Sequence, residues 1–509
     1  MSRLALLVVA LAGPALAQDG PQRLAPAGLE AFSHFGIALD AGTDVLAVGA
    51  TGTTAPGDDE GAVFVYVQSP GAWTLAQRLV APSVVGTGYV GASVDVSPDG
   101  RWLIAGAPLD ETEGIGTGAA FVWRLDGGTW TFDAKLVADD AEAFDEFGQD
   151  VAISDDGEAL VGAPFEGDGP TGGGNGAAYL FTRATGGGWT QTAKLQPPDL
   201  PAGATFGRAV SIDAGFAAVG APVPGPFGLP QPPTDPGYVY VFAREASGAW
   251  TQTQRLTGDD SVNGDFFGGA VDLLGGRLAV GANQDQDAGP VTGAVYVFEQ
   301  GGVAFAQTDK LVPAGAESQD GIGFAVAFAA DGTGRLVFSA LGDDDGGENA
   351  GAVYVYRPCS CGGDWIWDAK LLGTGSDDRY GWSVGADGAD VVVGAYTDSA
   401  AGFASGAAYA YDVPFVLADT PPVTAGELAV GAARPHPAAE GATFTITGAG
   451  EATVEVVDAL GRTVAHLGSV TAAPGRPATV TLPDLAPGVY AVVARQGAAT
   501  ATRVVVVGR

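Results

Sequence analysis

Seven copies of one motif follow one another through most of the chain. Each copy contains three markers in a fixed order, and successive copies of the first marker are 55 to 61 residues apart. The first marker is an aromatic or aliphatic residue followed by Gly: Phe35-Gly36, Val90-Gly91, Phe147-Gly148, Phe206-Gly207, Phe267-Gly268, Ile322-Gly323 and Tyr380-Gly381. The second is a Val-Gly-Ala-Pro-like step, which degenerates in the sixth copy at residues 338–341, and the third is a Gly-led apolar run such as residues 293–298. A period of this length restricts the chain to a solenoid, a propeller or another array of like units.

Each copy predicts four short strands, which we name A to D. Strand A follows the first marker, strand B runs into the second, and strand C is the third. Strand D ends at a Leu that follows an aromatic residue by six positions, as Leu79 follows Trp73, and Arg or Lys always precedes this Leu. In strand C both alternating sets of side chains are apolar, which is typical of strands covered on both faces. Because stacked propeller blades bury both faces of their inner strands, we predict an all-β fold with a seven-bladed β-propeller.

The seventh copy lacks strand D after Tyr411, and the missing segment stands at the start of the mature chain. Residues 22–26 (Gln-Arg-Leu-Ala-Pro) repeat the pattern of residues 77–82, and Leu24 precedes Gly36 by twelve residues, as Leu79 precedes Gly91. The N-terminal strand is therefore predicted to complete the last blade and to close the ring, which removes exposed sheet edges.

These markers resemble the FG-GAP repeats of integrin α-subunit propellers and their bacterial relatives, over about residues 19–415. Repeats of that family often carry a calcium loop, Asp-x-Asp-x-Asp-Gly, between strands A and B. The corresponding turns here, such as Ser97-Pro98-Asp99-Gly100, are short and lack the spaced oxygen ligands that calcium needs. The family's calcium sites are therefore not carried over to this chain.

Residues 1–17 predict a secretory signal peptide, with Arg3 at its positive start, an apolar stretch over 4–12 and Ala15-Leu16-Ala17 at the cleavage site. No apolar run is long enough to span a bilayer as a helix. We therefore predict an exported chain with a propeller over 18–415, a linker over 416–428 and a C-terminal domain over 429–509.

The formal net charge of −36 comes from the repeats, because residues 425–509 hold six acidic residues and six Arg, which cancel. Such a field repels nucleic acid and anionic membranes, so no nucleic-acid partner is expected. It is compatible with solubility alone, with cation binding and with a basic partner.

The C-terminal part predicts five short strands between residues 443 and 507, in an arrangement typical of a small immunoglobulin-like β-sandwich. It resembles the C-terminal sorting domain of type IX secretion substrates of Gram-negative bacteria. The matching segments are Arg434-Pro435-His436-Pro437, residues 457–462, residues 485–490 and the last strand, residues 502–507. The resemblance implies passage across the outer membrane through the type IX machinery, followed by attachment to the surface or release.

Catalytic constellations are absent from the sequence pattern. The three histidines, His34, His436 and His466, stand in different units and in no metal-ligand spacing. Cys359 and Cys361 are separated by one residue, which in an exported chain favours a local disulfide, and no chemistry is assigned to them. We therefore predict a non-enzymatic, monomeric protein with no cofactor other than weakly bound calcium.

Acidic residues gather in the B–C loops and in the connections from strand D to the next strand A, which emerge on one face of a propeller. Asp285 with Asp287 and Asp343 with Asp345 offer two or three oxygens each, which predicts weak, millimolar calcium binding. We predict that this face binds an extracellular protein or glycan in adhesion at the surface of a Gram-negative cell. The alternatives are a secreted propeller hydrolase or lyase that acts on polysaccharide, and a spacer without a ligand.

Overall fold

The computed structural model describes residues 21–52, 60–69, 72–167, 174–223, 235–359, 365–373 and 375–413, and in the C-terminal part residues 429–430, 443–447, 450–458, 462–472, 478–481, 485, 488–496 and 499–507. The predicted signal peptide and the predicted linker lie outside these residues. Over the described ranges the regular elements are strands, with no helix that is long and apolar enough to cross a membrane.

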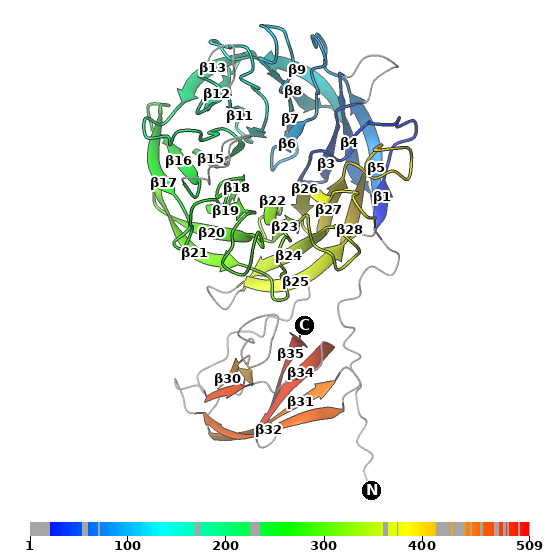
Figure 1. The fold of residues 1–509 in the computed structure, drawn as a ribbon, viewed down its shortest axis with the longest axis vertical. Coiled ribbons are helices and arrows are strands. Elements are labelled where there is room, and N and C mark those ends of the chain that lie inside the picture. The colour runs from blue at the N-terminus through cyan, green and yellow to red at the C-terminus, as the bar shows by residue number, and fades with distance from the viewer. Residues whose placement is uncertain are drawn as a thin grey trace.

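Seven four-stranded antiparallel sheets stand around a central axis as the blades of a propeller (Figure 1), which confirms the predicted number of blades. Blade 1 contains β2 (Leu39–Gly42), β3 (Val45–Ala50), β4 (Ala62–Ser69) and β5 (Ala72–Leu79). Blade 2 contains β6 (Ser93–Val96), β7 (Trp102–Ala107), β8 (Ala119–Asp126) and β9 (Thr129–Leu136). Blade 3 contains β10 (Val151–Ile153), β11 (Glu158–Ala163), β12 (Ala177–Arg183) and β13 (Trp189–Leu195).

The remaining blades repeat this plan, with strand A near the axis and strand D at the rim (Figure 1). Blade 4 contains β14 (Ala209–Asp213), β15 (Phe216–Ala221), β16 (Tyr238–Arg244) and β17 (Trp250–Leu256). Blade 5 contains β18 (Ala270–Leu274), β19 (Arg277–Ala282), β20 (Ala294–Gly301) and β21 (Ala304–Leu311). Blade 6 contains β22 (Ile322–Phe328), β23 (Leu336–Ala340), β24 (Ala352–Pro358) and β25 (Trp365–Leu372). Blade 7 contains β26 (Tyr380–Asp387), β27 (Asp390–Ala395), β28 (Ala407–Asp412) and β1 (Gln22–Leu24).

The N-terminal strand β1 closes the ring, as predicted. It pairs antiparallel with β28, with Gln22 opposite Ala410 and Leu24 opposite Ala408, and so takes the place of strand D in blade 7. Leu24 is buried in an apolar cluster that spans blades 7 and 1. The two ends of the repeat region are thus held in one sheet.

The core lies between neighbouring blades, where the apolar side chains of one sheet pack on those of the next. One such cluster joins Ile104 and Val122 of blade 2 to Val161 and Tyr179 of blade 3, and it also contains Phe147 of the first marker. The Gly of the second marker lets the backbones approach, because a Cβ atom on Gly106 would lie 2.0 Å from the Gly148 carbonyl oxygen.

The C-terminal strands form two sheets. One sheet has the order β29 (Ala429–Val430), β30 (Thr443–Thr447) and β33 (Ala478–Thr481). The other has the order β32 (Thr463–Ala472), β31 (Gly450–Asp458), β34 (Gly488–Gln496) and β35 (Ala499–Val507). An apolar cluster contains side chains of both sheets, among them Ile446, Val454 and Val492. The sequence did not predict β29 or β32, and β32 contains Gly468 at a φ of 86°, which interrupts its alternation.

Candidate functional site

The B–C loops and the connections between blades lie on one face of the ring, as the sequence predicts. Backbone bridges join the end of a B–C loop to the first marker of the next blade, at Gly61–Val90, Gly118–Phe147, Gly176–Phe206, Gly293–Ile322 and Gly406–Phe35. We call this surface the loop face. The loop face carries Asp285, Asp287, Asp343 and Asp345, the residues that the sequence predicted to bind calcium.

In blade 5 the nominated carboxylates surround a lysine. The Lys310 ammonium lies 2.9 Å from Asp285 Oδ2, 2.7 Å from Asp287 Oδ2 and 2.9 Å from Asp260 Oδ2. It also lies 5.0 Å from the centre of the Tyr296 ring, and the Tyr296 hydroxyl lies 2.8 Å from both Asp260 Oδ1 and Asp285 Oδ2, so that its one proton is donated to either carboxylate. Burial alone would lower the pKa of Lys310, but the hydrogen bonds to these partners raise it. The ammonium therefore takes the place that a bound cation would need.

Blade 6 repeats the arrangement around Lys370. Its ammonium lies 2.6 Å from Asp343 Oδ2 and 2.8 Å from Asp345 Oδ2, and 5.1 Å from the centre of the Tyr354 ring. The Tyr354 hydroxyl donates a hydrogen bond of 2.9 Å to Asp343. Asp343 is 3% exposed, so its charge has little water to solvate it and the ammonium supplies the compensation.

The same constellation, which we call a cation cage, occurs at equivalent positions in other blades. A Lys or Arg near the end of strand D contacts a carboxylate of a B–C loop or a connection and lies beside an aromatic residue of strand C. The pairs are Lys135–Asp110, Lys194 with Glu166 and Asp140, Arg255–Asp199 and, through the closing strand β1, Arg23–Asp398. All four Lys of the chain, at 135, 194, 310 and 370, sit in such cages.

The cages give the Lys or Arg before the last Leu of strand D a role that the sequence reasoning did not assign. In blades 2, 3, 5, 6 and 7 the charged end of strand D contacts the B–C loop of its own blade. In blades 2, 3 and 5 it also contacts the connection from the preceding blade, and in blade 4 Arg255 contacts that connection. Hydrogen bonds to these cations lower the pKa of Asp140, Asp260 and Asp398 against the opposing effect of burial. Among the described residues, no group of three or more His, Cys, Asp or Glu side chains is arranged to hold a metal ion.

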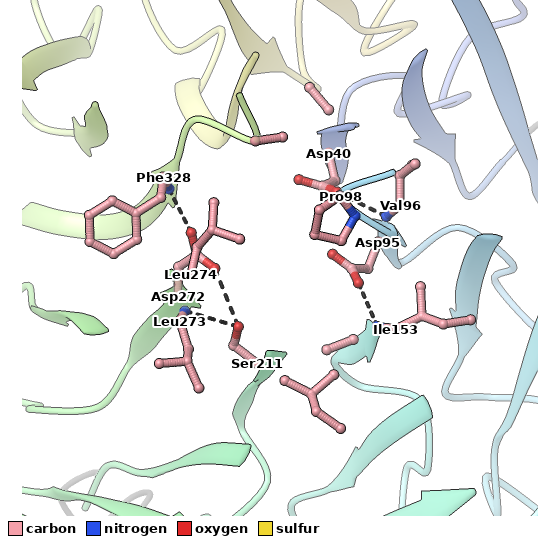
Figure 2. Close-up of a pocket in the computed structure, with 14 residues that line it drawn as sticks. Asp40, Asp95, Val96, Pro98, Ile153, Ser211, Asp272, Leu273, Leu274 and Phe328 are labelled. Atoms are coloured by element: carbon pink, nitrogen blue, oxygen red, sulfur yellow. Dashed lines mark hydrogen bonds between the residues drawn. The ribbon is translucent and has the colours of Figure 1, made fainter. Parts of the chain in front are cut away.

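A second set of carboxyls lines a cavity on the propeller axis (Figure 2). The cavity has a volume of about 50 Å³ and is lined by strands A, with Asp40, Asp95, Ser211 and Asp272 directed into it. Each carboxyl accepts a hydrogen bond from a backbone N–H of the next blade: Asp40 from Val96 (2.9 Å), Asp95 from Ile153 (2.6 Å) and Asp272 from Phe328 (2.6 Å). These residues stitch neighbouring blades together at the axis.

The axial carboxyls accept hydrogen bonds from backbone N–H groups and do not contact an ammonium of the described residues. Their pKa values are raised, whereas those of Asp140, Asp260 and Asp398 in the cages are lowered. Burial raises the pKa of Asp272 to about 7, and a nearby Asp150, which accepts from the Val210 N–H, also has a pKa raised by burial to about 7. Burial and the charge of Asp40 raise the pKa of Asp95 well above its ordinary value. Burial also raises the pKa of Asp40, and the charges of Asp40 and Asp272 add to the effect of burial on Asp95.

The histidines do not converge with these carboxyls. His34 lies on the loop face, with Nδ1 3.5 Å from Thr51 Oγ1 and its ring edge-on to Tyr396. His466 lies exposed on β32, and His436 is outside the described residues. Cys359 is disulfide-bonded, which agrees with the predicted local disulfide. Cys361 lies outside the described residues.

The comparison with protein families identifies the repeat. Five segments match the FG-GAP repeat: residues 130–181, 189–242, 250–298, 305–356 and 369–411. Each segment begins in strand D of one blade and ends in strand C of the next. The structure shows that blade 1 and strands A to C of blade 2, which precede these matches, follow the same strand order.

Comparisons with other proteins give distant likenesses. The chain is similar to the WD40 repeats of RRP9, with 10% identity, a TM-score of 0.47 and coverage of 77% of this chain and 97% of that chain. It is similar to a protein from Lactobacillus plantarum, with 15% identity, a TM-score of 0.42 and coverage of 86% and 99%, and to Saccharomyces cerevisiae Sqt1, with 10% identity, a TM-score of 0.40 and coverage of 82% and 95%. A search of curated protein sequences finds no match.

Proposed function

The chain carries five FG-GAP repeats within a ring of seven blades, and from this we propose that it is an exported binding protein that holds its partner on the loop face. The proposed setting is adhesion, at the surface of a Gram-negative cell or after release from it. The partner class is an extracellular protein or glycan.

The cation cages are the observation that carries this proposal. They fix B–C loops and connections to the blades through buried charges: Asp110 is 0%, Asp285 1% and Asp398 3% exposed. A loop that is already held in place loses little conformational freedom when a partner binds, so more of the contact energy appears as affinity. Rigid loops on a stable scaffold are typical of binding surfaces.

A non-enzymatic role agrees better with the axial cavity than a hydrolase or lyase does. Its paired carboxyls have raised pKa values, which an acid–base pair would need. However, a cavity of about 50 Å³ holds only a few water molecules, which is too little space for a sugar ring. We therefore assign these carboxyls to the joining of blades.

We further propose that the C-terminal part is an immunoglobulin-like sorting domain for type IX secretion. The two sheets with a shared apolar cluster support this proposal, together with the motif residues quoted above. Residues 434–437 of that motif are outside the described residues. Removal of residues 425–509 is expected to leave the propeller folded and to trap it in the periplasm, which cell fractionation measures, and normal surface delivery of the truncated chain would contradict the assignment.

A binding screen tests the main proposal. The full chain is applied to arrays of extracellular matrix proteins and of glycans, and we expect at least one specific ligand. Binding should be lost when a loop-face B–C loop is replaced by a Gly-Ser linker and retained when an A–B turn on the opposite face, such as residues 97–100, is replaced. If the A–B replacement alone abolishes binding, the loop face is not the site.

A further inference from the structure

Two pairs of apolar residues are exposed on the loop face at equivalent positions of the ring. Phe32, in the connection into blade 1, is 57% exposed, and Phe403, in the B–C loop of blade 7, is 69% exposed. Their ring centres are 5.2 Å apart. Phe144, in the connection into blade 3, is 43% exposed, and Ile115, in the B–C loop of blade 2, is 61% exposed.

Both pairs are built on the same backbone contact. The Phe32 N–H donates to the Phe403 carbonyl oxygen (2.9 Å), and the Phe144 N–H donates to the Ile115 carbonyl oxygen (3.0 Å). Each Phe precedes the aromatic residue of the first marker by three positions and has a positive φ, 65° for Phe32 and 70° for Phe144. A bulky residue in this region of φ is strained.

Other blades show that the fold does not require an aromatic residue at this position. The connection into blade 5 has Gly264 there, at a φ of 98°, and its N–H donates to the Asp235 carbonyl oxygen (3.2 Å). The connection into blade 6 has Gln319, at a φ of 77°, and its N–H donates to the Pro290 carbonyl oxygen (2.9 Å). Phe32 and Phe144 are thus strained and exposed to water at a position where Gly would satisfy the backbone conformation. Neither folding nor solubility therefore accounts for an aromatic residue there.

The pairs belong to one arc of the loop face. Between them, Val85 is 44% and Tyr89 36% exposed, so large exposed apolar side chains follow the ring from blade 7 to blade 3. In the described part of blades 4 to 6, the comparable exposed residues at this face are Val262 and Leu372. Apolar surface gathered on one side of a face marks an interaction site.

The charge around the arc is negative. Exposed carboxylates stand two residues from its apolar side chains: Glu30 before Phe32, Glu113 before Ile115 and Glu142 before Phe144. Unlike the caged carboxylates, these are not buried against a lysine. Protein interfaces combine an apolar centre with a polar rim, and complementary charge favours the correct partner. An acidic rim therefore fits a partner with Lys and Arg around its apolar contact.

We propose that the arc Phe403–Phe32–Val85–Tyr89–Ile115–Phe144 is the docking surface for a basic protein partner, which packs apolar side chains against the exposed rings and places Lys or Arg against Glu30, Glu113 and Glu142. The proposal rests on the binding role of the loop face and names the class of partner and the half of the ring that holds it.

The test uses the full chain and a random peptide library displayed on phage as the probe. Selected peptides are expected to combine aromatic or aliphatic residues with Lys or Arg, and their affinity should fall as salt is raised. The double variant Phe32→Gly/Phe144→Gly should weaken binding on the order of tenfold. Because glycine relieves the positive φ, the same variant should keep or raise the Tm, whereas a merely structural role for the rings predicts a lower Tm.

Gln319→Gly is the matched control, since it changes the same backbone position on the other side of the ring and should leave peptide binding unchanged. If peptides bind the loop face and bind the double variant equally well, the arc is not the docking surface, while the binding role of the loop face is retained. Neutral oligosaccharides whose binding the double variant abolishes would assign the arc to a glycan and overturn the protein partner. Failure to enrich any peptide, with no ligand found on the matrix and glycan arrays, would overturn both proposals.

Discussion

The carboxylates of the loop-face cages and those of the propeller axis make an instructive comparison. Both sets are carboxylates that join one segment of the repeat to another. The cages combine buried ones, such as Asp285, with exposed ones, such as Asp260, whereas Asp272 at the axis is half-buried. In a cage, Asp260 and its neighbours face the Lys310 ammonium, and the pKa of Asp260 is lowered. At the axis, Asp272 faces a backbone N–H and other carboxyls, and its pKa is raised to about 7.

Whether the pKa of a carboxyl is raised or lowered does not depend on the face of the propeller on which the carboxyl lies. Asp265 and Asp320 also lie in connections on the loop face, but each accepts a hydrogen bond from a backbone N–H, of Val262 and Glu317 respectively. Burial raises the pKa of both to about 6. The caged carboxyls with a lowered pKa, Asp140, Asp260 and Asp398, each contact a Lys or Arg side chain, whereas Asp265 and Asp320 accept a hydrogen bond from a backbone N–H.

The largest effect is expected when a cage loses its cation. Lys310→Met leaves Asp285, 1% exposed, without its ammonium, and should reduce the free energy of unfolding by about 3–5 kcal/mol. Thermal or denaturant unfolding measures this. Lys310→Arg is the control, because Arg255 and Arg23 fill the same position in blades 4 and 7. A loss below about 1 kcal/mol would mean that water solvates the cage and that the pair behaves as a surface ion pair.

Two neutral substitutions sharpen the comparison. At neutral pH Asp285→Asn removes a charge-assisted hydrogen bond from Lys310 and should cost about 1.5–3 kcal/mol. Asp272→Asn keeps an acceptor for the Phe328 N–H and removes a carboxyl that burial disfavours as an anion, so stability should stay equal or rise. The Tm values of the two variants are compared in one buffer. Equal decreases in Tm would show that caged and axial carboxyls contribute to stability in the same way.

The pH dependence of stability should show both classes. Carboxyls with raised pKa values, such as Asp150, Asp272 and Asp265, bind their proton more tightly in the folded state. Their contribution is complete below the ordinary value of 3.8 and is lost as the pH rises through about 6 to 7. Carboxyls with a lowered pKa, such as Asp260 and Asp398, release their proton more readily in the folded state. Their contribution to stability is complete above pH 3.8 and is lost as the pH falls through their folded pKa.

The Tm is therefore expected to be highest in mildly acidic solution and to fall by several degrees toward neutral pH. Scanning calorimetry across this range checks the expectation. The Asp272→Asn variant should show a flatter decline on the neutral side and an unchanged decline on the acid side. A Tm that rises steadily from acid to neutral pH would show that the axial carboxyls ionise freely.

The blades were predictable from the sequence, whereas the cages and the axial carboxyls were only partly so. The markers determine the strands because glycines and apolar alternation act locally, and the twelve-residue spacing of Leu24 and Gly36 identifies the closing strand. Asp260 and Lys310 are 50 residues apart, and no local rule places them together. The signal was nevertheless present, since all four Lys hold one position of the repeat.

The axial set was harder to find. Asp40, Asp95 and Asp272 all stand four residues after the Gly of the first marker, so alignment of the copies could reveal them. Asp150 stands two residues after its Gly and reaches the next blade from a different place. Which of these carboxyls lack a cation depends on the burial of strand A at the axis, and that follows from closure of the ring rather than from any single copy.

The smallest effect is expected for calcium, and it follows from the same comparison. The carboxylates nominated as ligands, Asp285, Asp287, Asp343 and Asp345, are already in contact with Lys310 or Lys370, so calcium must displace an ammonium or bind the outer oxygens. A millimolar site at tenfold excess would add RT ln 11, about 1.4 kcal/mol, and competition with the ammonium should hold the gain below this. Calorimetry of the wild-type chain with calcium and with chelator should therefore show almost the same Tm. Lys310→Met vacates the cage and leaves three carboxylates, those of Asp260, Asp285 and Asp287, facing one space, so calcium should restore part of the stability that this variant loses. A micromolar site in the wild-type chain, or unfolding by chelator, would show that calcium and not lysine holds these loops.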